Sequence, residues 1–182
     1  IYWQGPDSFE ASETNVYRAL LDNAETILDI GANTGLYSLI AGVNNSDTKV
    51  YSFEPMPVIA ETLRRNIRAN SFDHVQVFEM ALTDQDGEIT LHVPVQSTLP
   101  MGSSTSADFR RNTKPITVKA QTLDSFISEQ QIRQVDLMKI DTESTEPAVL
   151  RGGERLIKRD RPLIIIEILN DISAKPIAQF FE

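Results

Sequence analysis

Residues 26–35 read TILDIGANTG, and this stretch decides the fold expected for the chain of 182 residues. Its first five residues are apolar or β-branched apart from one acid, a composition typical of a buried strand. Gly31 and Gly35 then allow a tight turn and leave the backbone open to a ligand. Beyond the turn, apolar residues recur at the spacing of one helix face: Leu36, Leu39, Ile40 and Val43.

The spacing of the glycines distinguishes two kinds of ligand. A nicotinamide dinucleotide site shows the pattern G-x-G-x-x-G, in which backbone groups cradle a pyrophosphate. Counted from Gly31, this chain has Asn33 and Leu36 where the other two glycines would stand. S-adenosylmethionine has no pyrophosphate, so the looser spacing suffices for it. The turn favours that cofactor, and a plain glycine-rich turn with an incidental Asp29 is the alternative without a ligand.

An acid at the end of the next predicted strand supports a nucleoside ligand. Glu54 ends the strand Lys49–Glu54, is followed by Pro55, and lies 23 positions after the first glycine of the turn. An acid in that place accepts hydrogen bonds from both ribose hydroxyls of a bound nucleoside. The alternative is a solvated acid at a strand end. Asp29 is expected to position the amino group of the ligand, directly or through water.

Short β-branched runs alternate with helical stretches along most of the chain. The runs that predict strands of the main sheet are 26–30, 49–54, 75–80, 135–140 and 163–168. Helices are predicted after residue 35, over 57–67, 124–131 and 173–182, and over 146–156 with a break near Gly152-Gly153. Strands that alternate with helices predict an α/β fold with a mostly parallel sheet covered on both faces.

Residues 83–121 interrupt this alternation. A turn at Asp86-Gly87 precedes two predicted strands, Ile89–Val93 and Ile116–Ala120, which flank the Ser/Thr-rich loop Gln96–Ser106. We predict a small β-hairpin inserted in the main fold.

Composition disfavours several classes of function. The net charge is −9, from 17 basic and 26 acidic side chains, and no basic cluster is long enough to follow a nucleic-acid backbone. The chain has no cysteine, and its two histidines, His74 and His92, do not have the spacing of a metal site. No run approaches the ~20 apolar residues of a membrane span. We predict a small-molecule or saccharide partner and a cytoplasmic location, without metal, nucleic acid or membrane.

Together these motifs resemble the FkbM family of S-adenosylmethionine-dependent methyltransferases. The resemblance covers roughly residues 26–169. The glycine turn is shared with many methyltransferases, whereas the Phe-Glu-Pro-x-Pro and Lys-Ile-Asp-x-Glu runs are fairly specific to this family. The matching runs are residues 28–38 (LDIGANTGLYS), 53–57 (FEPMP), Leu63 with 66–67 (NI), 81–84 (ALTD), 122–124 (TLD), 136–143 (DLMKIDTE), and Glu146 with 149–152 (VLRG).

The resemblance implies a Rossmann-like class I methyltransferase that uses S-adenosylmethionine to methylate a hydroxyl oxygen of a natural product or a sugar. Carried over by position, one set of residues would hold the cofactor: Asp29, Gly31, Asn33, Gly35 and Glu54. In the same family pattern, Ala81 and Leu82 would lie near the adenine. Asp141 would face both the methionine end of the cofactor and the substrate.

Class I methyltransferases normally end with two further strands, one of them antiparallel, and residues 1–182 stop before these. The chain also begins at Ile1 rather than Met. We therefore expect a fragment of a longer protein, in which residues 1–182 are a single domain with a helical lead-in over 1–25. The sheet edge beside Leu163–Ile168 would then be exposed.

Three acids are candidates for taking a proton from the acceptor hydroxyl. Asp141, Glu143 and Glu167 all lie near the carboxyl ends of predicted strands, where α/β sheets bind their ligands. Asp141 is the first choice. Glu143 and Glu167 could equally cap a helix or contact the substrate without proton transfer.

One residue departs from the family pattern. The family usually has glycine after Asp-x-Glu, and this chain has Ser144. If that glycine takes a positive φ, Ser144 is strained or the loop has moved. The inserted loop carries Ser103, Ser104 and Ser106, which could line the acceptor site, although a polar loop without that role is the better expectation.

Two rival functions follow from the same observations. The first is a methyltransferase-like domain without catalysis that serves as an interaction module, which Ser144 and the missing strands would permit. The second is a nicotinamide-dependent oxidoreductase, which the missing glycines disfavour.

Overall fold

The computed structural model describes residues 11–94, 113–168 and 171–182. The loop Gln96–Ser106 with Ser103, Ser104 and Ser106 lies outside the described residues, as do residues 1–10 of the expected lead-in. The described helices are α1 (Ala11–Leu21), α2 (Leu36–Asn44), α3 (Pro57–Ala69), α4 (Leu123–Glu129), α5 (Glu146–Gly152), α6 (Glu154–Asp160) and α7 (Asp171–Phe181). The described strands are β1 (Thr26–Ile30), β2 (Lys49–Phe53), β3 (Val75–Phe78), β4 (Ala81–Thr83), β5 (Gly87–Pro94), β6 (Thr113–Thr122), β7 (Leu137–Ile140) and β8 (Leu163–Ile166).

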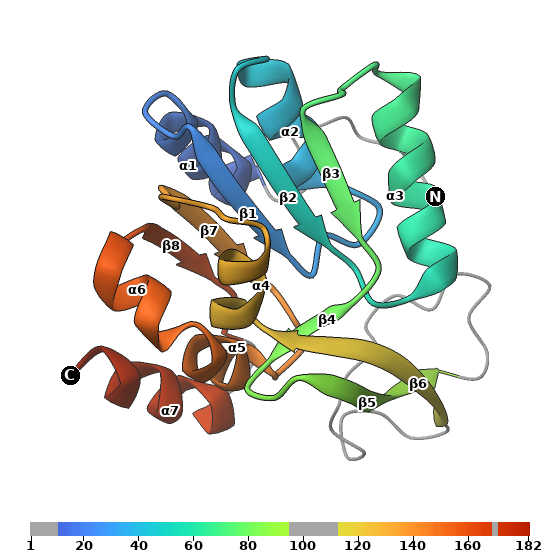
Figure 1. The fold of residues 1–182 in the computed structure, drawn as a ribbon, viewed down its shortest axis with the longest axis vertical. Helices are drawn as coiled ribbons and strands as arrows, with labels where there is room; N and C mark the ends of the chain where they lie inside the picture. The colour runs from blue at the N-terminus through green and yellow to red at the C-terminus, as the bar shows by residue number, and fades with distance from the viewer. Residues whose placement is uncertain (1–10, 95–112, 169–170) are drawn as a thin grey trace.

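Five strands form the main sheet in the order β3-β2-β1-β7-β8, and every neighbouring pair is parallel. The chain moves outward from β1 to β3 and later adds β7 and β8 on the other side of β1 (Figure 1). The strand order therefore reverses between β1 and β7. Open parallel sheets bind ligands at such a switch point, beyond the carboxyl ends of the strands. The predicted α/β fold with a mostly parallel sheet is confirmed.

Helices cover both faces of the main sheet, as the alternation predicted. On one face, Tyr17 of α1 and Leu63 of α3 pack with Ile27 of β1 in one apolar cluster. On the other face, Phe126 of α4 packs with Leu28, the next residue of β1, in a second cluster. Successive residues of a strand point to opposite faces, so a strand buried on both faces is apolar almost throughout.

The inserted segment forms a second sheet in the order β4-β6-β5. β5 and β6 are antiparallel, with Leu91 opposite Ile116, so the predicted hairpin is confirmed. β4 adds a third strand, which pairs in parallel with β6 and which the sequence did not predict. β3 ends at Phe78 rather than at the predicted Met80, because the chain changes sheets before β4. The second sheet thus extends slightly beyond residues 83–121 at both ends.

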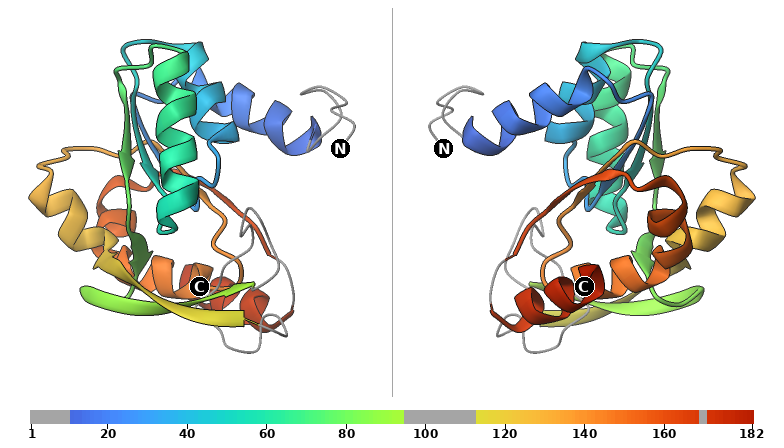
Figure 2. Two further views of the ribbon diagram at one scale, coloured as in Figure 1. Left: turned by 90° about the vertical axis from the view of Figure 1, so that its right-hand side faces the viewer. Right: turned by 90° about the vertical axis from the view of Figure 1, so that its left-hand side faces the viewer.

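The second sheet lies at the carboxyl-terminal end of the main sheet (Figures 1 and 2). A third apolar cluster, called here the hairpin cluster, holds it there. Its buried members are Leu91 and Val93 of β5, Val118 of β6, and Met56 and Ile59 at the start of α3. The second sheet therefore packs on the segment that follows β2.

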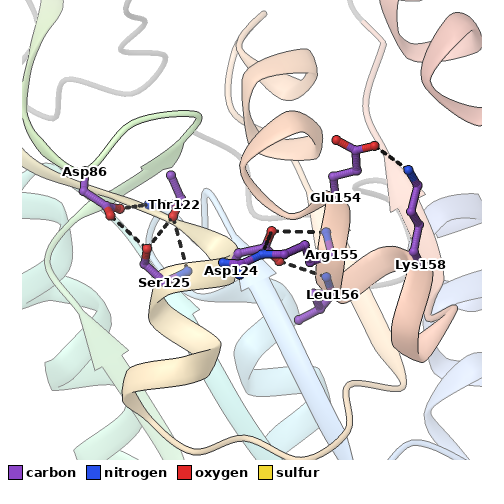
Figure 3. Close-up of polar contacts among 8 residues, drawn as sticks. All are labelled: Asp86, Thr122, Asp124, Ser125, Glu154, Arg155, Leu156 and Lys158. Carbon is purple, nitrogen blue, oxygen red and sulfur yellow. Dashed lines mark hydrogen bonds and ion pairs between the residues drawn. The ribbon is translucent and has the colours of Figure 1, made fainter.

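Acidic side chains join the second sheet to α4, and α4 to α6 (Figure 3). Asp86, in the turn before β5, accepts hydrogen bonds from the Thr122 amide (2.6 Å) and the Ser125 hydroxyl (2.8 Å). The Thr122 hydroxyl accepts a bond from the Ser125 amide and caps α4. Asp124 accepts bonds from two backbone amides in the first turn of α6, at 3.1 and 2.8 Å. The run Thr122-Leu123-Asp124 therefore has a structural role.

The last third of the chain follows the prediction with small differences at the boundaries. The helix predicted over 146–156 is broken at the glycine pair, with α5 ending at Gly152 and α6 beginning at Glu154. In the described part of the chain, β8 pairs only with β7, so the predicted open edge beside this strand is present, although the strand ends at Ile166 rather than Ile168. Within the same ranges, none of the helices has the length and apolar character needed to cross a bilayer.

Candidate functional site

A pocket opens at the switch point, beyond the carboxyl ends of β1, β2 and β7. It encloses about 800 Å³ of space between protein atoms, open solvent included. Six residues predicted to hold the cofactor are in its lining: Gly31, Asn33, Glu54, Ala81, Leu82 and Asp141. The remaining lining residues are Ile30, Phe53, Pro55, Ile59, Met80, Thr83, Ile89, Leu91, Thr142, Glu143 and Thr145.

Gly31 brings the turn after β1 against the segment that follows β7. The Gly31 amide donates to the Phe53 carbonyl (3.0 Å), and the Asp141 amide donates to the Ile30 carbonyl (3.0 Å). A Cβ on Gly31 would lie 1.8 Å from the Asp141 carbonyl oxygen, and the φ of Gly31 is +78°. Only glycine lacks a Cβ and also adopts this positive φ readily. Gly31 therefore allows the ends of β1 and β7 to approach each other closely at the pocket.

Glu54 is held in the pocket wall by the backbone around it. It is only 6% exposed. Its Oε2 accepts a hydrogen bond from the Asn33 amide (3.1 Å), and its Oε1 accepts one from the Met56 amide (2.9 Å). Burial raises the pKa of Glu54 to about 7, against the effect of these two bonds. Each carboxylate oxygen can accept a further bond, so Glu54 can still accept bonds from the hydroxyls of a sugar.

Apolar residues of the two outer strands of the second sheet, β4 and β5, line the pocket. Met80, Ala81 and Leu82 come from the end of the β3–β4 connection and from β4, and Ile89 and Leu91 come from β5. Small-molecule pockets are mostly apolar with few polar groups. This part of the pocket therefore suits the flat face of a nucleobase.

The three candidate catalytic acids gather where β7 and β8 end. Asp141 and Glu143 line the pocket, whereas Glu167, directly after β8, is outside the lining. Burial, followed by the adjacent Asp141 carboxyl, raises the pKa of Glu167 to about 7. Among the residues that the structure describes, no group of three or more His, Cys, Asp or Glu side chains could hold a metal ion.

Two residues predicted to hold the cofactor lie behind the pocket. Asp29 is fully buried, and its Oδ2 accepts a hydrogen bond from the Ser38 hydroxyl at 2.5 Å. Burial raises the pKa of Asp29, and its Oδ1 has no hydrogen-bond partner in the described ranges. Gly35 precedes α2, and a Cβ on it would lie 2.4 Å from Leu63 Cδ1. In this arrangement both residues support the turn and do not line the pocket.

The loop after Asp141 contains two residues with positive φ, one of them Ser144, where the family usually has glycine. The φ angle is +56° at Glu143 and +79° at Ser144. The fully buried Glu146 anchors the loop, because its Oε1 accepts bonds from the Thr142 amide (3.0 Å), the Thr142 hydroxyl (3.1 Å) and the Ser144 amide (3.1 Å). The loop therefore keeps its anchored shape, and Ser144 is strained.

Replacing Ser144 by glycine is expected to stabilise the chain. A non-glycine residue with left-handed φ costs ~1–2 kcal/mol, and the Ser144 hydroxyl is buried without a partner in the described part of the chain. Glycine loses more conformational entropy on folding than serine, which offsets part of this gain. S144G should therefore raise the free energy of unfolding by about 1 kcal/mol, measured by urea denaturation. The control is S71G, at an exposed serine with φ +55°. If S144G raises the free energy of unfolding no more than S71G does, the buried hydroxyl of Ser144 does not destabilise the chain.

The sequence interpretation missed two residues of the site, Lys139 and Glu146. Lys139 Nζ donates to Asp141 Oδ2 at 2.8 Å, and its side chain is only 8% exposed. Both residues belong to motifs that carried the family resemblance, but neither was given a role. The available signal for Lys139 was a charge inside an otherwise apolar strand.

Comparison with known proteins places this geometry in a family. The model of the methyltransferase FkbM domain matches residues 29–181, which include every described residue of the pocket lining. The chain belongs to the FkbM methyltransferase family. The family resemblance predicted from the glycine turn and the Lys-Ile-Asp-x-Glu run is therefore confirmed.

Relatives of this FkbM-family chain include two named methyltransferases. The 2-O-methyltransferase NoeI of Sinorhizobium fredii is 26% identical over 166 residues, a match that covers 82% of this chain and 68% of NoeI. Methyltransferase 1 of Beauveria bassiana is 28% identical over 142 residues, covering 69% of this chain and 57% of the relative. The chain thus matches about 57–68% of the length of these relatives.

A solved structure agrees with the fold of this FkbM-family chain. The O-methyltransferase from Bacillus cereus, solved in complex with SAH, superposes with a TM-score of 0.57 at 17% identity. The superposition covers 97% of this chain and 70% of that protein. The predicted Rossmann-like class I methyltransferase fold is confirmed.

Proposed function

We propose that this chain binds S-adenosylmethionine in the pocket and methylates a hydroxyl oxygen of a small molecule or a saccharide. One observation carries the proposal: Glu54, Gly31 and Asp141 follow the adjacent strands β2, β1 and β7 and line a single pocket. The names of two relatives support an oxygen acceptor, a 2-O-methyltransferase and the 31-O-demethyl-FK506 methyltransferase FkbM of Streptomyces tacrolimicus.

The residues present fit an adenosyl ligand. Glu54 would accept hydrogen bonds from the ribose hydroxyls, and Ala81 and Leu82 would contact the adenine. Gly31 leaves the backbone open at the switch point, where a side chain would meet Asp141. Asn33 lines the pocket beside Glu54, and its amide already fixes one oxygen of that acid.

When bound, the cofactor supplies a methyl group activated by a sulfonium. The chain itself must orient the acceptor hydroxyl and take its proton, and orientation alone can contribute ~7–11 kcal/mol. We assign removal of the proton to Asp141, the first choice among the three acids, because it lines the pocket and also lies against the carboxyl of Glu167. Glu167 lies beside Asp141 and has a pKa of about 7, so it can receive the proton from Asp141 near neutral pH. Glu143 would contact the acceptor.

Isothermal titration calorimetry with S-adenosylhomocysteine tests the cofactor. Micromolar binding of this ligand, with no tight binding of NADH in a parallel titration, is the expected result. Tight NADH binding without S-adenosylhomocysteine binding would instead support the oxidoreductase alternative. Failure to bind either ligand would support a domain without catalysis.

Transfer to oxygen requires a separate measurement. The chain is incubated with S-adenosylmethionine carrying a labelled methyl group and a panel of hydroxyl compounds that includes saccharides. Label that stays on the product after mild base indicates an ether and supports the proposal, whereas base-labile label indicates an ester. The cytoplasmic location and the single-domain organisation stay predictions.

A further inference from the structure

Lys139 occupies a position where a lysine is costly. All four residues of β7 are buried, and this strand lies between β1 and β8 in the main sheet. The Lys139 side chain is 8% exposed. Burying an ammonium without partners is strongly unfavourable, so a lysine at this position must be paired.

The partners of Lys139 connect the pocket with the residues behind it. Its Nζ donates to Asp141 Oδ2 at 2.8 Å and lies 4.4 Å from the centre of the Tyr37 ring, a cation–π distance. Across the sheet, Lys139 is in register with Asp29 of β1, and its charge favours the ionised form of that acid. The ammonium therefore interacts with one carboxylate in the pocket lining and one beneath the glycine turn.

Stability alone does not account for this arrangement. Buried ion pairs are often no more stabilising than well-packed apolar residues of similar volume, and the neighbours of Lys139 in β7 are Met138 and Ile140. What the lysine adds is a fixed position for one oxygen of Asp141, at the residue where the pocket needs an oriented acid.

We propose that Lys139 is a positioning residue that fixes the ionised carboxylate of Asp141 toward the ligand. The inference rests on the proposed function, because it assumes that Asp141 contacts an adenosyl ligand in this pocket. Lys139 itself is outside the pocket lining and acts through Asp141.

A double-mutant cycle measured with S-adenosylhomocysteine tests the proposal. K139Q removes the charge and is expected to weaken binding by about 10-fold or more, and D141N by a similar factor. In the D141N background, K139Q should change the affinity by less than about twofold, because the carboxylate that it positions is already gone. The control is K158Q, which removes an exposed lysine paired with Glu154 and should leave the affinity unchanged.

The outcomes separate this inference from the proposed function. If the unmodified chain does not bind S-adenosylhomocysteine, the proposed function fails and this inference fails with it. If the chain binds but K139Q binds within twofold of it, only the role of Lys139 is overturned. Independent, multiplicative effects of K139Q and D141N would overturn it as well, because they indicate a general effect on packing.

A spectroscopic measurement decides the question if K139Q does not fold. The buried, ion-paired ammonium of Lys139 should give a lysine side-chain signal in ¹H–¹⁵N spectra of the unmodified chain, with an upfield shift from the Tyr37 ring, assigned by its loss in K139R. Addition of S-adenosylhomocysteine should move this signal, because the ligand contacts its partner Asp141. A signal that stays in place at saturating ligand would overturn the proposal.

Discussion

G31A is expected to lower the free energy of unfolding by about 3–5 kcal/mol, or to prevent folding altogether. The added Cβ would lie 1.8 Å from the Asp141 carbonyl oxygen and 2.8 Å from its carbonyl carbon, both backbone atoms of the neighbouring strand end. Overpacking of this kind costs ~1–3 kcal/mol or more, and the left-handed φ of +78° adds ~1–2 kcal/mol. The backbone of Asp141 cannot yield without disturbing the pairing of β1 with β7. Urea denaturation followed by circular dichroism measures the loss.

G87A is the matched control for this substitution. Gly87 also has a positive φ, +127°, but a Cβ on it would meet no atom within 4 Å. G87A should therefore show the conformational cost alone, about 1–3 kcal/mol. Equal losses for G31A and G87A would mean that the turn after β1 does not approach the end of β7 in solution.

E54Q is expected to weaken the binding of S-adenosylhomocysteine by about 30-fold or more. Hydrogen bonds to a charged group are worth ~1.5–3 kcal/mol each, and the proposed ribose contacts use the carboxylate. The amide would also place an NH₂ group toward the amide of Asn33 or of Met56, both of which now donate to Glu54. Calorimetric titration measures the affinity. E61Q is the control, because Glu61 is exposed on α3 and pairs with Arg68 outside the pocket.

The affinity of the unmodified chain should also depend on pH around neutrality. Burial raises the pKa of Glu54 to about 7, so this acid is mostly protonated at pH 6 and mostly ionised at pH 8. In the proposed complex the ionised form would accept bonds from both ribose hydroxyls, so affinity should be high above pH 7 and fall as the pH drops through 7. Glu167 titrates in the same range, and E54Q identifies the group responsible. A pH dependence that persists unchanged in E54Q would assign it to another acid.

Local sequence patterns predicted the parts of the site that depend on residues close together along the chain. The strand, turn and helix around Gly31 follow from apolar spacing and two glycines, and the acid after β2 follows from its place at a strand end. The departure at Ser144 left two alternatives, strain or a moved loop, and the φ of +79° at this residue corresponds to strain. In each case the physical cause lies within a few residues of the feature.

Features that depend on distant residues were not predicted. The parallel pairing of β4 with β6 joins segments about 40 residues apart, and neither strand shows in its own sequence which neighbour it will have. The close approach of Gly35 to Leu63 was not predicted either, because Leu63 belongs to another helix, α3. The role of Lys139 required the position of Tyr37 and Asp29, which only the folded sheet brings together.

Residues of two apolar clusters meet in the lining of the pocket. Ile30, Phe53 and Leu82 of its lining belong to an apolar cluster of the main sheet, whereas Ile59 and Leu91 belong to the hairpin cluster. A molecule that fills the pocket contacts residues of both clusters at once. Occupancy of the site and docking of the second sheet are therefore linked equilibria, and each must favour the other to the same extent.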